Sequence, residues 1–254
     1  MLLFLRVFLI IVWILLLLPY QLIFIFIKSK LRFLLPVYFH KILLKILGIR
    51  LSLLGKPSNL KPLVLVGNHC SYLDIIILSS LLPVCFVAKS EIKKWFFFGF
   101  LAKIQNSIFI DRNSLRALDS FKKVSDSLSS KFSVIIFPEG TTNNGKKILK
   151  FRTSLFKVFE DNPTLRLQNF SLCYTHINNM PLDNRFRPTI AWYGGMNMIT
   201  HLGRLLNYSS VRASVVFHPV TSSSGINRKE LTNESRKQVI EGINLIQNKK
   251  SKYN

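Results

Sequence analysis

Acidic residues are scarce in this chain of 254 residues. Asp and Glu number 12 against 35 Lys and Arg, which gives a net charge of +23, and no acidic residue precedes Asp74. Such a charge predicts an anionic partner: nucleic acid, an anionic membrane or a phosphorylated substrate. The first 73 residues carry nine Lys or Arg but consist mostly of Leu, Ile, Phe and Val. That composition favours a lipid surface, so we expect membrane lipids as partners and no nucleic acid.

Cysteine is also rare. Cys70, Cys85 and Cys173 are an odd number and lack the spacing of metal ligands, so they do not form a disulfide framework and indicate a reducing compartment. The five histidines are scattered, without the paired spacing of a zinc site. We therefore expect reduced thiols and no metal site.

Charge is missing altogether from residues 7–27. At about 1.5 Å per residue, roughly 20 apolar residues cross a hydrocarbon core of about 30 Å, and the run is too long for a signal peptide and has no small-residue cleavage site after it. Three basic residues follow the run within five positions, against Arg6 alone before it. The positive-inside rule then places the rest of the chain in the cytoplasm. Pro19 interrupts the run, so a re-entrant pair of helices in one leaflet is an alternative to a span.

A second helix is expected over residues 37–54. Lys41, Lys45, Gly48 and Ser52 fall on one face, and Leu and Ile fill the rest. This pattern suits a membrane interface or a core helix with a solvated lysine face. We predict that residues 1–56 form membrane-anchoring and interfacial helices, and that residues 57–254 form a separate α/β domain.

The rest of the chain alternates between strand and helix patterns. Helical spacing is found at 75–82, 114–130 and 229–248, and short β-rich runs are found at 63–67, 84–88, 107–110, 133–137, 170–174, 189–193 and 211–217. This alternation predicts an α/β domain with a mixed, largely parallel sheet flanked by helices.

Polar groups follow three of these strands. The segment from Asn68 to Asp74 follows the first, Asp111-Arg112 follows residues 107–110, and Pro138-Glu139-Gly140-Thr141 follows residues 133–137. In open α/β sheets, sites lie beyond the carboxyl ends of the strands. We therefore expect these groups to meet at one edge.

His69 and Asp74 are the candidate catalytic pair. They are five residues apart across a strand-to-helix turn, which lets the carboxylate reach one imidazole nitrogen and leaves the other free to take a proton from a hydroxyl. A lone His-x4-Asp pattern also occurs by chance, and the histidine is then structural. Cys70 and Ser71 are too close to His69 in sequence to form an easy nucleophile–base pair with it.

The remaining candidates have two interpretations each. Arg112 is either a surface salt bridge, worth little, or a bidentate phosphate clamp, and Lys89 would add a second positive charge. Gly140 permits a sharp reversal, so Glu139-Gly140-Thr141 is either a plain turn or a turn whose amides hold an anion.

Together these residues resemble the glycerolipid acyltransferase family. The resemblance rests on two motifs, Asn68-His69-x4-Asp74 and Phe137-Pro138-Glu139-Gly140-Thr141. Two further segments also match the family, Ile108 to Arg112 and Ala88 to Glu91. The similarity extends over roughly residues 60–220. Within the family, the chain looks most like the 1-acyl-sn-glycerol-3-phosphate (lysophosphatidic acid) acyltransferases.

The resemblance implies a bacterial inner-membrane enzyme with its catalytic domain on the cytoplasmic side. It would move a fatty acyl group from acyl-CoA or acyl-carrier protein to the sn-2 hydroxyl of 1-acyl-sn-glycerol-3-phosphate, without a cofactor. His69 would be the general base and Asp74 its orienting partner. The implied substrate-binding residues are Asn68, Lys89, Arg112, Glu139, Gly140 and Thr141, of which Arg112 and Lys89 would hold the phosphate. Oligomeric state stays open.

Three residues depart from the family pattern. Thr142 stands where the family often has Arg, Asn106 where it often has Gly, and Asn169 where it usually has Pro. Thr142 removes one cation near the acceptor, which loosens the inference to a phosphate-bearing acceptor. Another lysolipid, such as lyso-ornithine lipid, is therefore the alternative acceptor.

Overall fold

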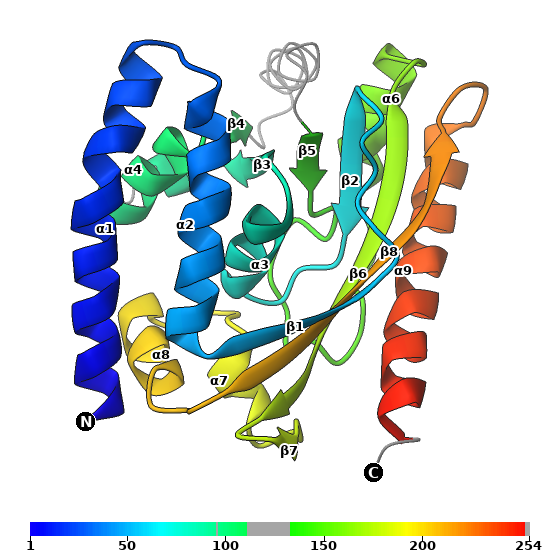
Figure 1. Ribbon diagram of the computed structural model, residues 1–254. Coiled ribbons are helices and arrows are strands. Elements are labelled where there is room, and N and C mark those ends of the chain that lie inside the picture. The colour runs from blue at the N-terminus through cyan, green and yellow to red at the C-terminus, as the bar shows by residue number, and fades with distance from the viewer. Residues whose placement is uncertain (95, 111–132, 252–254) are drawn as a thin grey trace.

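A central mixed sheet with helices on both faces organises the chain (Figure 1). The computed structural model describes residues 1–94, 96–110 and 133–251. The predicted helix at 114–130 and the candidate Arg112 lie outside the described residues. In the described part, the α-helices are α1 (Leu2–Phe26), α2 (Leu31–Leu47), α3 (Leu73–Leu81), α4 (Phe96–Ile104), α6 (Lys157–Asp161), α7 (Arg187–Ile190), α8 (Met198–Leu205) and α9 (Arg228–Ser251), with 3₁₀ turns η1 (Ser90–Lys94) and η2 (Thr153–Phe156).

The strands run in the spatial order β1-β8-β6-β2-β5-β3-β4, and β7 pairs with β6. Their bounds are β1 (Ile49–Leu54), β2 (Leu63–Gly67), β3 (Val84–Lys89), β4 (Ile108–Ile110), β5 (Ser133–Ile136), β6 (Arg166–Ile177), β7 (Met180–Pro181) and β8 (Val211–Ser222). Pairing is parallel except between β6 and β8 and between β6 and β7. The predicted mixed, mostly parallel α/β sheet is therefore confirmed.

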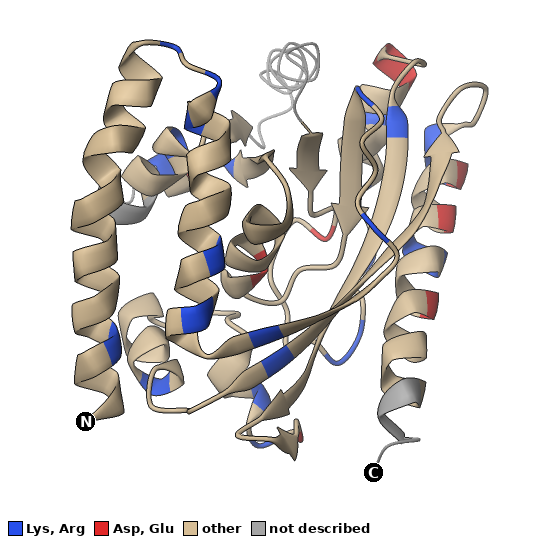
Figure 2. Ribbon diagram, viewed as in Figure 1, with Lys and Arg blue, Asp and Glu red and all other residues tan. Residues whose placement is uncertain are grey.

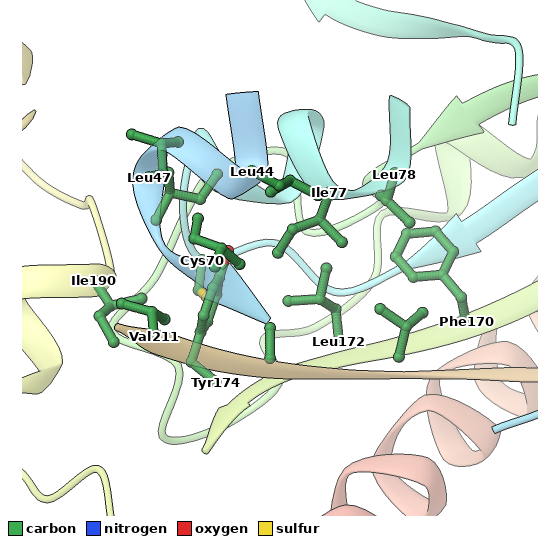
Figure 3. Packing of buried hydrophobic residues seen from close by; sticks show 14 of the residues in the cluster. Leu44, Leu47, Cys70, Ile77, Leu78, Phe170, Leu172, Tyr174, Ile190 and Val211 are labelled. Atoms are coloured by element: carbon green, nitrogen blue, oxygen red, sulfur yellow. The ribbon is translucent and has the colours of Figure 1, made fainter. Parts of the chain in front are cut away.

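Strand β2 shows how the sequence fills both faces of the sheet. Its five residues are all buried, and successive side chains point to opposite faces. Leu63 and Leu65 pack in a cluster with α2 and α3, while Val64 and Val66 pack in another with α9, η2 and α6. Figure 3 shows part of the first cluster, in which Leu44 and Ile77 approach from the helices. A strand covered on both sides reads as a continuous apolar run, and its carboxyl end leads directly to His69.

The predicted helix at 37–54 is wrong in its second half. Helix α2 ends at Leu47 because Gly48 adopts the left-handed conformation, with φ of 71°. A Cβ on Gly48 would lie 2.3 Å from the Ser209 carbonyl oxygen, so only glycine fits. Residues 49–54 form β1, which pairs parallel with β8. The division of the chain at residue 56 stays a prediction.

The predicted strand at 189–193 is also wrong. Residues 187–190 form the short helix α7, with Pro188 in its first turn, and the chain then continues without regular structure. Proline at this position is preset for a helix start. The β-branched and aromatic residues that follow Pro188 led us to predict a strand instead.

Helix α1 is apolar and long enough to cross a membrane, and only 6% of its most apolar part is buried inside the protein. Pro19 lies inside it without ending it. The two buried residues of the helix are Arg6 and Gln21, and both are polar. One stripe of α1 therefore carries polar groups into the protein, while its other faces present side chains such as Phe8 and Leu15 to the outside.

Candidate active site

Asp74 anchors the turn between β2 and α3. It lies in the first turn of α3 and is fully buried. Its Oδ2 atom accepts hydrogen bonds from the backbone N–H groups of Cys70 (2.8 Å) and Ser71 (3.0 Å), and it lies 2.8 Å from His69 Nδ1. A carboxylate at this position also suits the positive end of the helix dipole. The predicted pairing of His69 with Asp74 is therefore present in the structure.

Tyr174 completes the environment of the carboxylate. Its hydroxyl donates to Asp74 Oδ1 at 2.7 Å, so both carboxylate oxygens have donors. Burial, followed by the negative charge of Asp74, raises the pKa of the Tyr174 hydroxyl well above its ordinary value. Tyr174 therefore stays protonated and keeps donating. Sequence reasoning missed this residue, which comes from β6 a hundred positions away and has no local signal.

The His69 ring is held by stacking as well as by Asp74. It lies nearly parallel to the Phe137 ring, with centroids 3.9 Å apart, and Phe86 stacks behind Phe137. The His69 side chain is 16% exposed. With Asp74 accepting the Nδ1 proton, the lone pair of the neutral ring is on Nε2. This arrangement can take a proton from an approaching hydroxyl.

Glu139 fastens the next loop to His69. Its Oε1 accepts from the His69 backbone N–H at 2.9 Å, and its Oε2 accepts from Leu149 N and from Asn143 Nδ2. Burial raises the pKa of this carboxyl, and the hydrogen bonds oppose that shift. These hydrogen bonds join the His69 backbone to Asn143 and Leu149. They hold residues 139–149 beside the pair, and a direct role of Glu139 in positioning substrate stays a prediction.

The other expected site residues differ in burial and in the contacts that they make. Asn68 is buried and exchanges two 2.8 Å hydrogen bonds with the backbone of Leu172, so it joins the turn to β6. Gly140 has φ of 67°, and a Cβ there would lie 2.7 Å from Arg152 Nε. Thr141 is exposed beside it, and Lys89 is half-buried at the end of β3. Their roles toward substrate stay predictions.

Cys70 and Ser71 are poorly placed as nucleophiles. Both are buried, and their backbone N–H groups are used by Asp74. Burial, together with the charge of Asp74, raises the pKa of the Cys70 thiol well above its ordinary value, which suppresses the reactive thiolate.

Asn143 is a second residue that sequence reasoning missed. Its backbone N–H and its Nδ2 both lie 3.3 Å from the His69 carbonyl oxygen, and Nδ2 also donates to Glu139. Its Oδ1 accepts from Gly145 N at 2.6 Å, as in an Asx turn. Its place three residues after Gly140 is compatible with an ordinary loop, so the sequence alone gave no reason to select it.

We expect Asn143→Ala to lower both stability and activity. The change leaves the His69 carbonyl with one donor fewer and removes a partner from buried Glu139, and losing such a partner costs about 1–3 kcal/mol. Thermal unfolding and the acylation rate measure the two effects. Asn207→Ala is the matched control, because Asn207 is exposed and its side chain donates only to the Gly203 carbonyl. Equal, small effects of both changes would show that Asn143 does not support the pair.

The fold and the site together define a class. The chain places a His–Asp pair at the carboxyl edge of a mixed sheet, with a buried glutamate fastening the neighbouring loop, and such a pair can take a proton from a hydroxyl, as acyl transfer onto a hydroxyl requires. The family model described as "Acyltransferase" matches residues 53–167. The chain is 34% identical over 226 residues to the lyso-ornithine lipid O-acyltransferase of Rhizobium meliloti, covering 86% of this chain and 77% of that protein. The chain belongs to the acyltransferase family, and it is a lysolipid acyltransferase.

Two further similarities bear on the fold and the substrate. A 1-acyl-sn-glycerol-3-phosphate acyltransferase of Neisseria gonorrhoeae is 35% identical over 106 residues, which are 41% of this chain and 42% of that protein. The crystal structure of the 1-acyl-sn-glycerophosphate acyltransferase PlsC from Thermotoga maritima superposes with a TM-score of 0.63 at 18% identity, covering 84% of this chain and 78% of that one. The latter similarity shows the shared fold.

Proposed function

We propose that the protein transfers a fatty acyl group from acyl-CoA or acyl-carrier protein to the hydroxyl of a lyso-ornithine lipid. The observation that carries this choice is the extent of the similarity. Similarity to the lyso-ornithine lipid O-acyltransferase of Rhizobium meliloti covers 86% of this chain, whereas similarity to the 1-acyl-sn-glycerol-3-phosphate acyltransferase of Neisseria gonorrhoeae covers 41%. Thr142, in place of the arginine frequent in the family, supports an acceptor without phosphate. Lysophosphatidic acid is the second candidate acceptor, favoured by the Neisseria relative.

The proposed reaction uses His69 as the general base. His69 Nε2 takes the proton of the acceptor hydroxyl while the oxygen attacks the thioester carbonyl carbon. The tetrahedral intermediate then expels the thiolate, which recovers the proton from His69, so an ester and a free thiol are formed. Asp74 fixes the tautomer and stabilises the imidazolium that exists between the two transfers.

Membrane attachment through α1 is part of the proposal. Near one end of the helix, Arg6 donates to the Leu206 carbonyl at 3.1 Å and the Ser209 carbonyl at 2.8 Å, and to the Tyr208 carbonyl. Fifteen residues on, Gln21 Nε2 donates to the carbonyls of Arg32 and Ile104. The helix is thus tied to the domain at two points about 22 Å apart, which favours a helix lying in one leaflet over one that crosses the bilayer.

The charges agree with this placement. Helices α1 and α2 and strand β1 contain no acidic residue, and Figure 2 shows Lys and Arg over α2, β1 and β8, whereas α6 and α9 carry residues of both signs. Basic residues next to an apolar helix favour an anionic membrane surface. The expected location is the cytoplasmic leaflet of a bacterial inner membrane.

A protease-protection experiment tests the one-leaflet arrangement. We expect a cleavable tag before Met1 and one after Asn254 to be cut from the same side in sealed membrane vesicles. Inverted and right-side-out vesicles supply the two sides, and detergent-opened vesicles control for tag accessibility. Protection of the N-terminal tag alone in inverted vesicles would mean that α1 crosses the bilayer.

Lipid analysis tests the proposed acceptor. The chain is expressed in a bacterium that makes lyso-ornithine lipid but cannot acylate it, with the His69→Ala variant as control. We expect mass spectrometry to detect the doubly acylated ornithine lipid with the wild-type chain only. Unchanged lyso-ornithine lipid, together with restored phosphatidic acid in a strain lacking its own lysophosphatidic acid acyltransferase, would identify the second candidate as the acceptor.

A further inference from the structure

An arginine from α7 lies beside the catalytic turn. Arg187 is half-buried, and its Nη1 donates to the Gly145 carbonyl oxygen at 3.0 Å. A Cβ built on Gly145 would lie 3.6 Å from this Nη1 and 3.7 Å from Cys70 Cβ. The guanidinium therefore lies close to the residue that follows His69. Its positive charge also lowers the pKa of the Cys70 thiol, against the larger effect of burial.

The segment that carries Arg187 is fixed to the same turn. The backbone N–H of Trp192 donates to the Cys70 carbonyl oxygen at 2.8 Å, and His201, which lies 3.2 Å from the Ala191 carbonyl oxygen, contacts the Tyr72 hydroxyl at 3.0 Å. These contacts hold the segment after α7 against the turn that bears His69. A ligand bound by Arg187 would consequently be held at a fixed place relative to the pair.

Part of the guanidinium has no partner. Within the described residues, Arg187 Nε is buried and makes no hydrogen bond, and the ion pairs of arginine found there are those of Arg185 with Asp183 and of Arg228 with Glu160. A buried donor without an acceptor costs about 1–3 kcal/mol. Arg187 also lines a crevice with Asn68, Cys70, Tyr174 and Gly145. A guanidinium with an unpaired Nε, beside a crevice that also touches Asn68 and Cys70, is suited to bind an oxygen anion.

The position of Arg187 also compensates for a missing charge. Thr142 stands where the family often has arginine, and Arg187 brings a guanidinium from α7 to the same loop, three residues further on. Ornithine in an ornithine lipid offers a carboxylate and no phosphate, and a guanidinium fork binds a carboxylate through two parallel hydrogen bonds. We infer that Arg187 binds the carboxylate of the acceptor's head group and thereby determines acceptor specificity. The inference rests on the proposed function.

The test compares two acceptors with the purified full chain: lyso-ornithine lipid and the methyl ester of its carboxyl group. Losing a hydrogen bond to a charged group lowers affinity roughly 10- to 100-fold. We expect the wild type to show a KM that is higher by that factor for the ester. Arg187→Gln should raise the KM for the acid by the same factor, leave the KM for the ester and for the acyl donor unchanged, and so remove the discrimination.

Two further variants test whether the guanidinium group of Arg187 is responsible for the discrimination between acid and ester. Arg187→Lys keeps the charge but loses the fork, so its discrimination should lie between those of the wild type and Arg187→Gln. Arg185→Gln is the matched control, because Arg185 is two residues away, 84% exposed and paired with Asp183, and it should behave as the wild type.

The possible outcomes distinguish a failure of the proposed function from a failure of the role given to Arg187. A wild type that acylates no lyso-ornithine lipid overturns the proposed function and this inference with it. A wild type that acylates the acid and the ester with equal KM overturns the role of Arg187 alone, and this result does not depend on whether any variant folds. Arg187→Gln raising the KM of acid and ester equally would likewise show that Arg187 only supports the loop.

Discussion

We expect the His69→Ala variant to fold normally and to lose acyl transfer by about 10²- to 10⁴-fold in kcat, the usual contribution of a positioned general base. Asp74, Glu139 and Asn143 hold the turn through the backbone of residues 69–71, and alanine retains that backbone. The lost side chain packs on Phe137 and is partly exposed. The fold should therefore survive while proton removal from the acceptor fails.

Single-turnover rates with labelled acyl donor measure this loss, and circular dichroism checks the fold. His176→Ala serves as the matched control, since His176 is a half-buried histidine of β6 whose ring contacts Thr175. Activity of folded His69→Ala within a few-fold of the wild type would remove His69 from the mechanism.

The second large effect is expected for Asp74→Asn. This change keeps the shape of the side chain but removes the charge that stabilises the imidazolium, and in a related His–Asp arrangement the same change costs about 10⁴-fold. An amide also offers one acceptor oxygen where the carboxylate offers two. One of its donors, the Tyr174 hydroxyl or the N–H groups of Cys70 and Ser71, would lose its acceptor, at a cost of about 1–3 kcal/mol in stability.

The Tyr174→Phe variant distinguishes the effect of the Asp74 charge from the effect of the hydrogen bond that supports Asp74. It removes the donor to Asp74 Oδ1 and leaves the carboxylate and His69 in place, so its rate should fall far less than that of Asp74→Asn. Equal rates for the two variants would show that the charge of Asp74 is not needed and that Asp74 acts through packing alone.

The sequence predicted the parts of the site that are encoded locally. His69 and Asp74 are joined by a single turn, so their spacing already limits the distance between them. The buried strands of the sheet appear in the sequence as apolar runs. Glu139 was predicted through its motif, although in the structure it accepts hydrogen bonds from the backbone of His69 and Leu149 and from the Asn143 side chain.

Groups that depend on tertiary contact were not predictable. Tyr174 and Arg187 come from segments a hundred or more residues from Asp74 or Cys70 and carry no pattern of their own. The boundary between α2 and β1 depends on Gly48, because only glycine tolerates both its left-handed conformation and the close approach of the Ser209 carbonyl. An apolar periodicity that continues across such a glycine favours one long helix until the partner strand β8 is known.

A competition assay between two lysolipids identifies the acceptor that the protein prefers. The purified full chain is given equal concentrations of lyso-ornithine lipid and lysophosphatidic acid with one labelled acyl donor, and the two products are separated and counted. With the wild type, we expect label to enter the ornithine lipid in large excess over phosphatidic acid. With His69→Ala, we expect label to enter neither acceptor. Label entering phosphatidic acid in excess, or entering either acceptor at an undiminished rate with His69→Ala, would contradict these expectations.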